Sequence, residues 1–366
     1  PQLQFGQEYN KTAVEGRTFT LNIPCGGTSN HYQWFKDGIL LPAAPDASEL
    51  TISSIQFTDA GSYHISVTND LIPNLVLTSF PVHVNVEEPC MVRDSLALVA
   101  LYNATDGPNW THKDNWLTGP VKTWYGITTN GCNVVQINHN DNNLTGNLPP
   151  EIGNLTNLMH LGVNKLTGSI PVEIGNLKNL AYCRFWDNQL SGSIPVEIGL
   201  LTNLMYLDLG HNLLNGAVPS EIGQLNNLTG LILCYNQLNN SIPAEIRQLK
   251  NLTTLTLDNN QLSGAIPSEI GQLTNLTYLD LVGNQLSGVI PIEIGQLTNL
   301  TYLNLGGNQL SGAIPTEIGL LNNLTYLCFW DNKLSGNIPA EIGQLTNLSY
   351  FDLGHNQLSS AIPSEI

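Results

Sequence analysis

The chain has few charged residues, and few of those are basic. Of its 366 residues only 12 are Lys or Arg, against 29 Asp or Glu, which gives a formal net charge of −17. Affinity for nucleic acid depends on cationic contacts to phosphate, so this balance argues against a nucleic-acid partner. No run of 18 apolar residues occurs, so we expect no membrane span within the chain. The first residue is Pro1 rather than Met, which indicates a processed or trimmed start.

Catalytic motifs are also lacking. The sequence contains no HExxH, GxSxG, P-loop, GxGxxG or CxxC pattern, and its eight histidines are dispersed. No acid stands beside a base in a way that singles out one pair. We therefore expect a protein that is not an enzyme and that uses no metal and no cofactor.

A unit of 24 residues repeats through the second half of the chain and is clearest at 275–296. When the copies are aligned on one Asn, that Asn recurs at every 24th position. The aligned residues are Asn164, Asn188, Asn212, Asn236, Asn260, Asn284, Asn308, Asn332 and Asn356. A fixed period of this length predicts a solenoid, in which each unit buries its apolar edge only against neighbouring units.

Each position of the unit has a physical role. Residues such as Leu279 and Leu281 point inward, and Asn284 stands at the turn after the strand. Its carboxamide can bond backbone groups of its own coil and the next, which would make a ladder of satisfied buried amides. Gly288 permits a turn with unusual dihedrals, and Pro291 suits the first position of a short helical turn.

The unit Leu-x-x-Leu-x-Leu-x-x-Asn-x-Leu-x-Gly-x-Ile-Pro resembles the leucine-rich repeat, and its ending is similar to the plant-type subclass. That subclass occurs in receptor kinase ectodomains and polygalacturonase-inhibiting proteins. The resemblance implies a right-handed solenoid over residues 146–366, with a parallel β-sheet on its concave side. The last unit is cut short and no C-terminal cap follows it. We therefore expect an exposed apolar edge there and a natural protein that continues beyond Ile366.

Residues 90–145 resemble the N-terminal cap of the same family. The stretch from Asp94 to Tyr102 is amphipathic, which predicts a helix with Asp94 or Ser95 as its N-cap. The tryptophans that follow it are Trp110, Trp116 and Trp124. In such caps a helix and Trp residues cover the first coil, whose apolar edge would otherwise be open.

Residues 1–89 differ from the rest, with short strand-like runs separated by turn residues. Together Cys25, Trp34 and Tyr63 resemble an immunoglobulin-like β-sandwich, with Trp34 in the core and Tyr63 as the tyrosine corner. Ile65 stands where the second Cys of that fold belongs. We therefore expect no inter-sheet disulfide, and a free buried thiol at Cys25.

The remaining cysteines divide by position. Cys90 and Cys132 bracket the cap and are the candidate disulfide, because a secreted cap is stabilised by closing that loop. Cys183 replaces an inward Leu. Cys234 and Cys328 fall on outward strand positions four coils apart, roughly 19 Å at about 4.8 Å per coil, which is too far for a bond.

The outward residues of the strands form the candidate binding face, because side chains alternate across a strand. Aromatic rings beside Asp and Asn on a rigid sheet suit a protein surface or a sugar ring. The predicted partner-binding residues are Tyr182, Arg184, Trp186, Tyr206, Tyr278, Asp280, Tyr302, Asn304, Tyr326, Trp330, Tyr350 and Asp352. The alternative is that repeat duplication copied a Tyr that packs on its neighbours. Copying alone does not explain Trp at only two coils.

Other residues recur once per coil. The Glu row from Glu151 to Glu365 is interpreted as solvated side chains that favour their own helical turns, with a cation-binding stripe as the alternative. Asn-Leu-Thr and Asn-Leu-Ser triplets match N-glycosylation acceptors if the source is eukaryotic. The threonine row is Thr253, Thr277, Thr301 and Thr325.

The combined architecture resembles secreted or cell-surface leucine-rich repeat proteins of the Bacteroidota, because an immunoglobulin-like domain precedes a plant-like array. The interpretation is an extracellular adhesion protein that recognises a protein or polysaccharide at a cell surface. One alternative is an inhibitor of a secreted glycosidase, as the polygalacturonase inhibitors are. Others are a structural stalk without its own ligand and, from the threonine row, ice binding.

Overall fold

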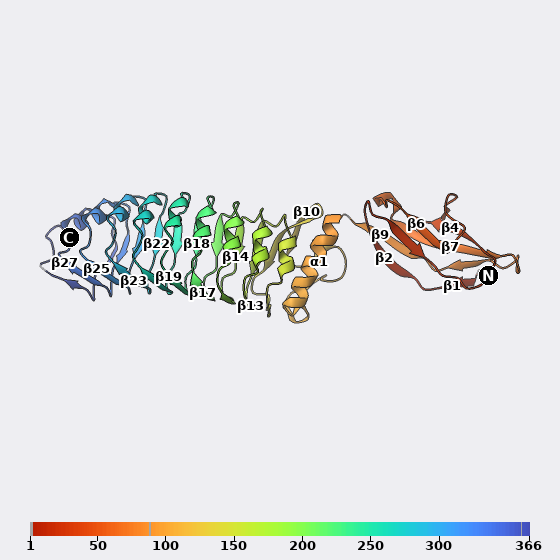
Figure 1. Ribbon diagram of the computed structural model, residues 1–366, viewed down its shortest axis with the longest axis horizontal. Coiled ribbons are helices and arrows are strands. Elements are labelled where there is room, and N and C mark those ends of the chain that lie inside the picture. The colour runs from red at the N-terminus through yellow and green to blue at the C-terminus, as the bar shows by residue number, and fades with distance from the viewer. Residues whose placement is uncertain (1–2, 88, 360) are drawn as a thin grey trace. The chain divides into compact units, whose positions relative to one another are not determined.

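The computed structural model describes residues 3–87, 89–359 and 361–366, and the chain divides into two compact units, Pro1–Arg93 and Asp94–Ile366 (Figure 1). The strands of the first unit are β1 (Leu3–Phe5), β2 (Tyr9–Val14), β3 (Phe19–Asn22), β4 (Asn30–Lys36), β5 (Ile39–Leu40), β6 (Glu49–Ile52), β7 (Gly61–Asn69), β8 (Leu77–Ser79) and β9 (Val82–Glu87). Strands β3 and β6 pair as one sheet. The larger sheet has the order β1-β8-β7-β4-β5, with β9 pairing both β7 and β2.

The first unit is a two-sheet β-structure around a buried core. Trp34 and Tyr63 are each only 1% exposed, and Ile65 is fully buried among them. The Tyr63 hydroxyl donates to the Asp59 carbonyl at 2.6 Å. Cys25 is free, as predicted, but it is half-buried rather than buried, because it lies in the loop beyond the end of β3.

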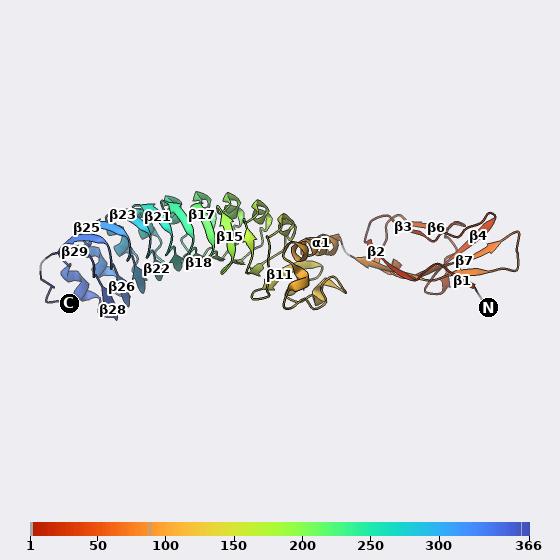
Figure 2. The same ribbon diagram turned by 90° about the horizontal axis from the view of Figure 1, so that it is seen from below.

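Helix α1 (Pro89–Ala104) includes the boundary between the two units, and the second unit continues from it into the solenoid. The concave sheet consists of β10 (Ile127–Asn130), β11 (Asn133–His139), β12 (His160–Val163), β14 (Tyr182–Arg184), β16 (Tyr206–Asp208), β18 (Gly230–Ile232), β20 (Thr254–Thr256), β22 (Tyr278–Asp280), β24 (Tyr302–Asn304), β26 (Tyr326–Cys328) and β28 (Tyr350–Asp352). From β11 onward its strands are parallel, as predicted, with matching positions of successive coils in register. In Figure 2, β18 and β22 lie along the inner side of the curve.

A second sheet runs along the outer side of the curve (Figure 2). It consists of β13 (Thr167–Gly168), β15 (Gln189–Gly192), β17 (Leu213–Ala217), β19 (Gln237–Asn240), β21 (Gln261–Gly264), β23 (Gln285–Gly288), β25 (Gln309–Gly312), β27 (Lys333–Gly336) and β29 (Gln357–Leu358). A short 3₁₀ helix completes each coil, for example Ile292–Gln296. Pro291 caps this helix from just outside rather than filling its first position. The inward Leu and Ile side chains between the sheets are almost fully buried, whereas those of the last coil are partly exposed, as predicted.

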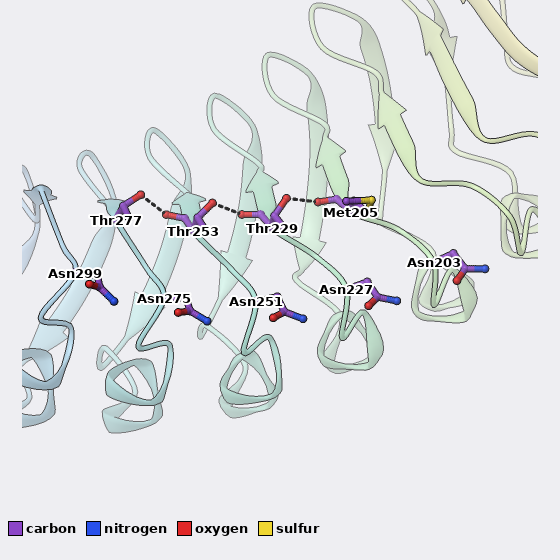
Figure 3. Close-up of a pocket in the computed structure, with 9 residues that line it drawn as sticks. All are labelled: Asn203, Met205, Asn227, Thr229, Asn251, Thr253, Asn275, Thr277 and Asn299. Carbon is purple, nitrogen blue, oxygen red and sulfur yellow. Dashed lines mark hydrogen bonds between the residues drawn. The ribbon is translucent and has the colours of Figure 1, made fainter.

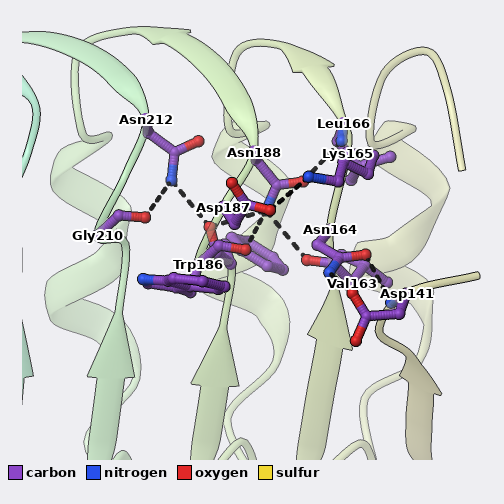
Figure 4. Close-up of polar contacts among 11 residues, drawn as sticks. Asp141, Val163, Asn164, Lys165, Leu166, Trp186, Asp187, Asn188, Gly210 and Asn212 are labelled. Carbon is purple, nitrogen blue, oxygen red and sulfur yellow. Dashed lines mark hydrogen bonds and ion pairs between the residues drawn. The ribbon is translucent and has the colours of Figure 1, made fainter. Parts of the chain in front are cut away.

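The predicted asparagine ladder is present, but its bonds between coils run to the preceding coil and not to the next (Figure 4). The Asn188 side-chain nitrogen donates to the carbonyls of Phe185 in its own coil and Val163 in the preceding one, at 2.7 and 3.0 Å. Its side-chain oxygen accepts from the Leu166 amide at 2.6 Å. The same pattern recurs from Asn212 to Asn356. Each Asn from Asn188 to Asn356 therefore satisfies backbone groups of two coils at once, whereas Asn164 bonds the amide and the carboxylate of Asp141.

The cap differs from prediction at its helix. Helix α1 begins at Pro89, so Asp94 lies inside it and is not its N-cap. Asp94 is instead fully buried and accepts from the Val134 amide of β11 at 2.8 Å, which fastens the helix to the first coil. The predicted tryptophan cover is confirmed, with Trp110 and Trp116 edge-to-face at 4.8 Å and both buried.

His139 is packed into this tryptophan cluster. Its ring is fully buried, 4.7 Å from that of Trp110, and burial lowers its pKa to about 4. The Asn142 side chain lies with its nitrogen 3.0 Å from Nδ1, which suits a neutral ring that accepts there. A proton added at Nδ1 would meet another donor in a site closed to water.

The cap should therefore lose stability in acid. The folded pKa lies below the ordinary value of 6.5, so the unfolded chain binds the proton first and stability falls as pH drops from 6.5 to about 4. His139 should account for roughly 3 kcal/mol of that loss, and His139→Leu should remove this part. Denaturant unfolding of both proteins, followed by tryptophan fluorescence from pH 7 to pH 4, measures the difference. Parallel pH profiles would contradict the assignment.

Candidate functional site

The predicted binding residues lie on the concave sheet or two residues beyond it, in two groups. The first group occupies β14, β16 and the turn after β14, and consists of Tyr182, Arg184, Trp186 and Tyr206. The second group occupies β22 to β28 and the turn after β26, and consists of Tyr278, Asp280, Tyr302, Asn304, Tyr326, Trp330, Tyr350 and Asp352. Gly230 and Thr254 occupy the tyrosine position in the coils between them.

The four tyrosines of the second group form a face-to-face stack. Ring centroids lie 4.1 Å apart for Tyr278 and Tyr302, and 4.3 Å apart for each of the next two pairs up to Tyr350. The rings are nearly parallel, within 12°. Their faces therefore cover one another, so the exposed strip consists mainly of ring edges and hydroxyls. Only Tyr350, at the end of the stack, is more than 40% exposed.

Polar side chains beneath this stack are occupied within the fold. Asp280 and Asn304 are each 7% exposed. The Tyr302 hydroxyl donates to Asp280 at 3.3 Å, and the Asn304 side-chain nitrogen donates to that hydroxyl at 3.3 Å. The other oxygen of Asp280 accepts from the Val282 amide at 3.1 Å. These groups orient the tyrosine hydroxyls, and Asp352 is the more exposed acid of the group.

The carboxyl group of Asp280 is buried, and burial disfavours its ionised form. Burial, together with the nearby Asp258 carboxylate, raises the pKa of Asp280 to about 6. Neighbouring coils show that a neutral residue fits the same position, since Asn304 occupies it on β24.

The first group is organised around a cation. Arg184 lies between two rings, 6.0 Å from the centroid of Tyr182 and 5.6 Å from that of Tyr206. The opposite side of Tyr182 stacks on His160 at 4.8 Å. The Tyr206 ring leans over Gly230, where an added Cβ would lie 2.6 Å from it. A side chain at Gly230 would therefore displace the ring.

The cysteines are placed largely as predicted. Cys183 is buried and free. Cys234 and Cys328 lie on the concave side, also free, but Cys328 is only 7% exposed because neighbouring coils cover it. Cys132 is disulfide-bonded. The side chain of Cys90 lies outside the described residues, so its pairing with Cys132 stays a prediction.

Two residues of the concave side were missed by the sequence reasoning. His211 contacts the Trp186 ring edge-to-face at 5.3 Å, and His355 contacts Trp330 in the same way at 5.4 Å. Both histidines directly precede a ladder Asn, one coil after a Trp. The sequence shows this shared position within the repeat, although the eight histidines as a set are dispersed along the chain.

A groove of about 690 Å³ runs beside the starts of the concave strands (Figure 3). Its lining residues are Asn203, Met205, Asn227, Thr229, Asn251, Thr253, Asn275, Thr277 and Asn299. Each Thr hydroxyl donates to a carbonyl of the preceding coil, as Thr253 does to Thr229 at 2.9 Å. The Asn side chains do the same, as Asn251 does to Asn226 at 2.8 Å. The groove is therefore a fixed lattice of Thr and Asn side chains.

Within the described ranges, no three His, Cys, Asp or Glu side chains are grouped closely enough to hold a metal ion. The helices of the same residues include none with the length and apolarity needed to cross a membrane. From Glu151 to Glu341 the Glu row lies on the 3₁₀ helices, with each Glu in the first turn of its own helix, whereas Glu365 lies in a turn.

Comparison with known families identifies the solenoid. Residues 131–264 match the model of a leucine-rich repeat region, and residues 250–310 and 323–345 match two further leucine-rich repeat models. A solved plant ice-binding protein is 30% identical, with a TM-score of 0.66, over 75% of this chain and 90% of that one. The chain belongs to the leucine-rich repeat family. Among curated proteins, no sequence matches it.

Two solved plant receptors are also similar. The plant peptide hormone receptor RGFR1, in complex with RGF2, is 43% identical with a TM-score of 0.60, over 60% of this chain and 36% of that one. The ectodomain of the Arabidopsis thaliana membrane receptor kinase GASSHO1/SCHENGEN3, in complex with CASPARIAN STRIP INTEGRITY FACTOR 2, is 36% identical with a TM-score of 0.71, over 74% and 34%. The chain thus spans about a third of the length of each receptor structure.

The buried carboxylate of Asp280 should cost stability at neutral pH. Its folded pKa of about 6 exceeds the ordinary value of 3.8, so stability is lost as pH rises through that interval. Asp280→Asn should therefore stabilise the protein at pH 7 by roughly 1–3 kcal/mol, with the gain vanishing near pH 4. Chemical denaturation at both pH values measures this. The matched control, Asn304→Asp, should have the opposite effect at pH 7, and equal stability of all three proteins would refute the account.

Proposed function

We propose that this chain is an extracellular binding protein that recognises a protein or glycan partner on the concave face of its solenoid. The observation that carries the proposal is the grouping of aromatic and polar side chains on one rigid parallel sheet. Large rings held by neighbouring coils offer contact area with few rotamers to freeze. The similar plant receptors are solved in complex with named peptide or factor ligands, which supports a binding role for this fold.

The first unit supports an extracellular setting in this proposal. We assign it to the immunoglobulin-like class, because Trp34 fills the core between two sheets and the Tyr63 hydroxyl bonds a carbonyl four residues upstream. An immunoglobulin-like unit before a plant-type array is the arrangement expected of a secreted or cell-surface protein of the Bacteroidota. In that setting the solenoid serves adhesion to a cell or a polysaccharide.

A second candidate function is ice binding, which the groove of Figure 3 favours. Thr and Asn recur there once per coil with their donors fixed, so hydroxyl, methyl and carboxamide groups are held in a regular two-row lattice. Such order suits the repeating surface of a crystal. The 30% identity to a plant ice-binding protein, over nine-tenths of its length, supports this candidate.

The concave face is tested by a pair of double variants. Trp330→Ala with Tyr302→Ala should weaken binding to the ligand that a glycan and surface-protein screen returns by 2 kcal/mol or more, roughly thirtyfold. Glu269→Ala with Glu293→Ala removes two solvated carboxylates from the 3₁₀ helices and should change the Kd little. Loss of binding in the glutamate variant alone would place the functional surface on the other side.

Ice binding is tested by thermal hysteresis and by inhibition of ice recrystallisation. If the lattice binds ice, both activities should appear in the intact protein and fall several-fold in Thr253→Lys with Thr277→Lys, because the long charged side chains break the flat surface. The aromatic variant above should keep them. An intact protein without either activity would eliminate this candidate.

A further inference from the structure

The solenoid carries two copies of one aromatic cluster, each centred on a Trp two residues before a ladder Asn. In the coils from Asn188 to Asn356 this position is occupied by Trp186 and Trp330, by three glycines, and by larger residues at 234, 258 and 282. The glycines are Gly210, Gly306 and Gly354, and each stands in a coil next to a Trp. At this one position, therefore, the glycine coils place no side chain beside either Trp ring.

On the other side of Trp186 the coil is irregular. On the paired strands, Gly162 lies opposite Arg184. Gly162 is two residues before its ladder Asn, whereas Arg184 is four residues before Asn188, so the earlier coil is shorter by two residues. Trp330 therefore has a glycine on both sides within this row, and Trp186 has one on the side of Gly210.

The glycines also fix where the rings lie. A Cβ added to Gly210 would lie 3.2 Å from Cδ1 of Trp186, and a Cβ added to Gly354 would lie 3.2 Å from Cδ1 of Trp330. Each indole thus leans on the glycine of the following coil, as Figure 4 shows for Trp186 and Gly210. The rings remain 48% and 41% exposed. This leaves an accessible aromatic surface on a rigid base.

A histidine completes each cluster at a backbone position that disfavours it. His211 and His355 have φ of 54° and 55°, in the left-handed region. The same left-handed φ occurs at Asp187, Tyr235, Asn259 and Asp331 in other coils, so it belongs to the turn of the repeat. Each imidazole contacts its indole with nearly the same geometry, at 5.3 Å and 64° in one cluster and 5.4 Å and 66° in the other.

An acid is held at the same place in both clusters. Asp208 accepts from the Gly210 amide at 3.1 Å, and Asp352 accepts from the Gly354 amide at 2.8 Å. In each case the bond is made by Oδ1, which fixes the carboxylate beside the indole. A ring, a carboxylate acceptor and an imidazole are the groups that recognise a pyranose, with its apolar C–H face and its hydroxyl donors.

Resting on the proposed function, we propose that Trp186 and Trp330 mark two equivalent subsites for sugar units of one neutral polysaccharide. The two clusters are 144 residues apart, which is six coils or about 29 Å at about 4.8 Å per coil. Equal subsites suit a ligand that repeats, whereas a peptide of unique sequence would meet different side chains at different coils. The net charge of −17 disfavours anionic polysaccharides, so the ligand is neutral.

The test uses the full chain and defined saccharides. Isothermal titration with cellotriose, laminaritriose and mannotriose should find at least one trisaccharide that binds at two equal sites. Trp186→Ala and Trp330→Ala should each reduce the stoichiometry to one, and the double variant should not bind. The soluble polymer of the same sugar should bind at least tenfold more tightly than the trisaccharide, and each single variant should lose that gain. Tyr125→Ala, a cap aromatic that is 40% exposed, is the matched control and should bind like the wild type.

Three results would overturn this assignment. They are no binding of any neutral saccharide, binding unchanged in the double variant, or tighter binding of polygalacturonate than of neutral polymers. Thermal melting of each variant verifies folding, and Gly354→Val, which crowds Trp330 without removing it, should act like Trp330→Ala. If saccharides fail but a protein partner from the screen depends on Trp330 and Tyr302, the proposed function stands and the sugar assignment is wrong. If neither class depends on these residues, both are wrong.

Discussion

The structure of the solenoid depends on hydrogen bonds between coils that repeat in register. From Asn188 to Asn356 each ladder Asn bonds a carbonyl of its own coil and both an amide and a carbonyl of the preceding coil, as Asn284 does with Leu281, Leu262 and Leu257. These bonds are buried, so an Asn replaced by an apolar residue would leave several backbone groups without partners. The 24-residue period follows from this constraint, because an insertion inside a coil would break the match with both neighbours.

The same constraint frees the outward positions to vary. Since the inward residues and the ladder hold each coil, residues between the strand Leu positions need only avoid clashing with the adjacent coil. Four consecutive tyrosines stack closely, whereas each Trp has a glycine at the same position of the following coil. The acid at Asp280 shows that some of these positions retain groups that the fold itself does not favour. Surface chemistry and coil stability are therefore largely separate properties of this chain.

Much of this architecture could be predicted from the sequence, because each position of the repeat can be compared across nine aligned copies. The parallel sheet, the Asn ladder and the buried Cys183 follow directly from repeat phase. The start of helix α1 could not be placed from the sequence. An Asp before an amphipathic run is typical of an N-cap, and only the structure shows that Asp94 lies inside the helix and bonds the Val134 amide. For the candidate site, position was predictable and orientation was not. The sequence shows a Tyr in each of four coils, but only the ring planes reveal that their faces are covered.

The coil is also a unit of length. Neighbouring coils meet through the same hydrogen bonds wherever they stand in the array, so one whole coil can be inserted or deleted without altering the packing of those on either side. Such a change would move features on the concave side apart or together in steps of about 4.8 Å. The distance between two features of the concave side is therefore set by the number of coils between them. That distance can evolve by gain or loss of whole coils, while the side chains of each feature stay the same.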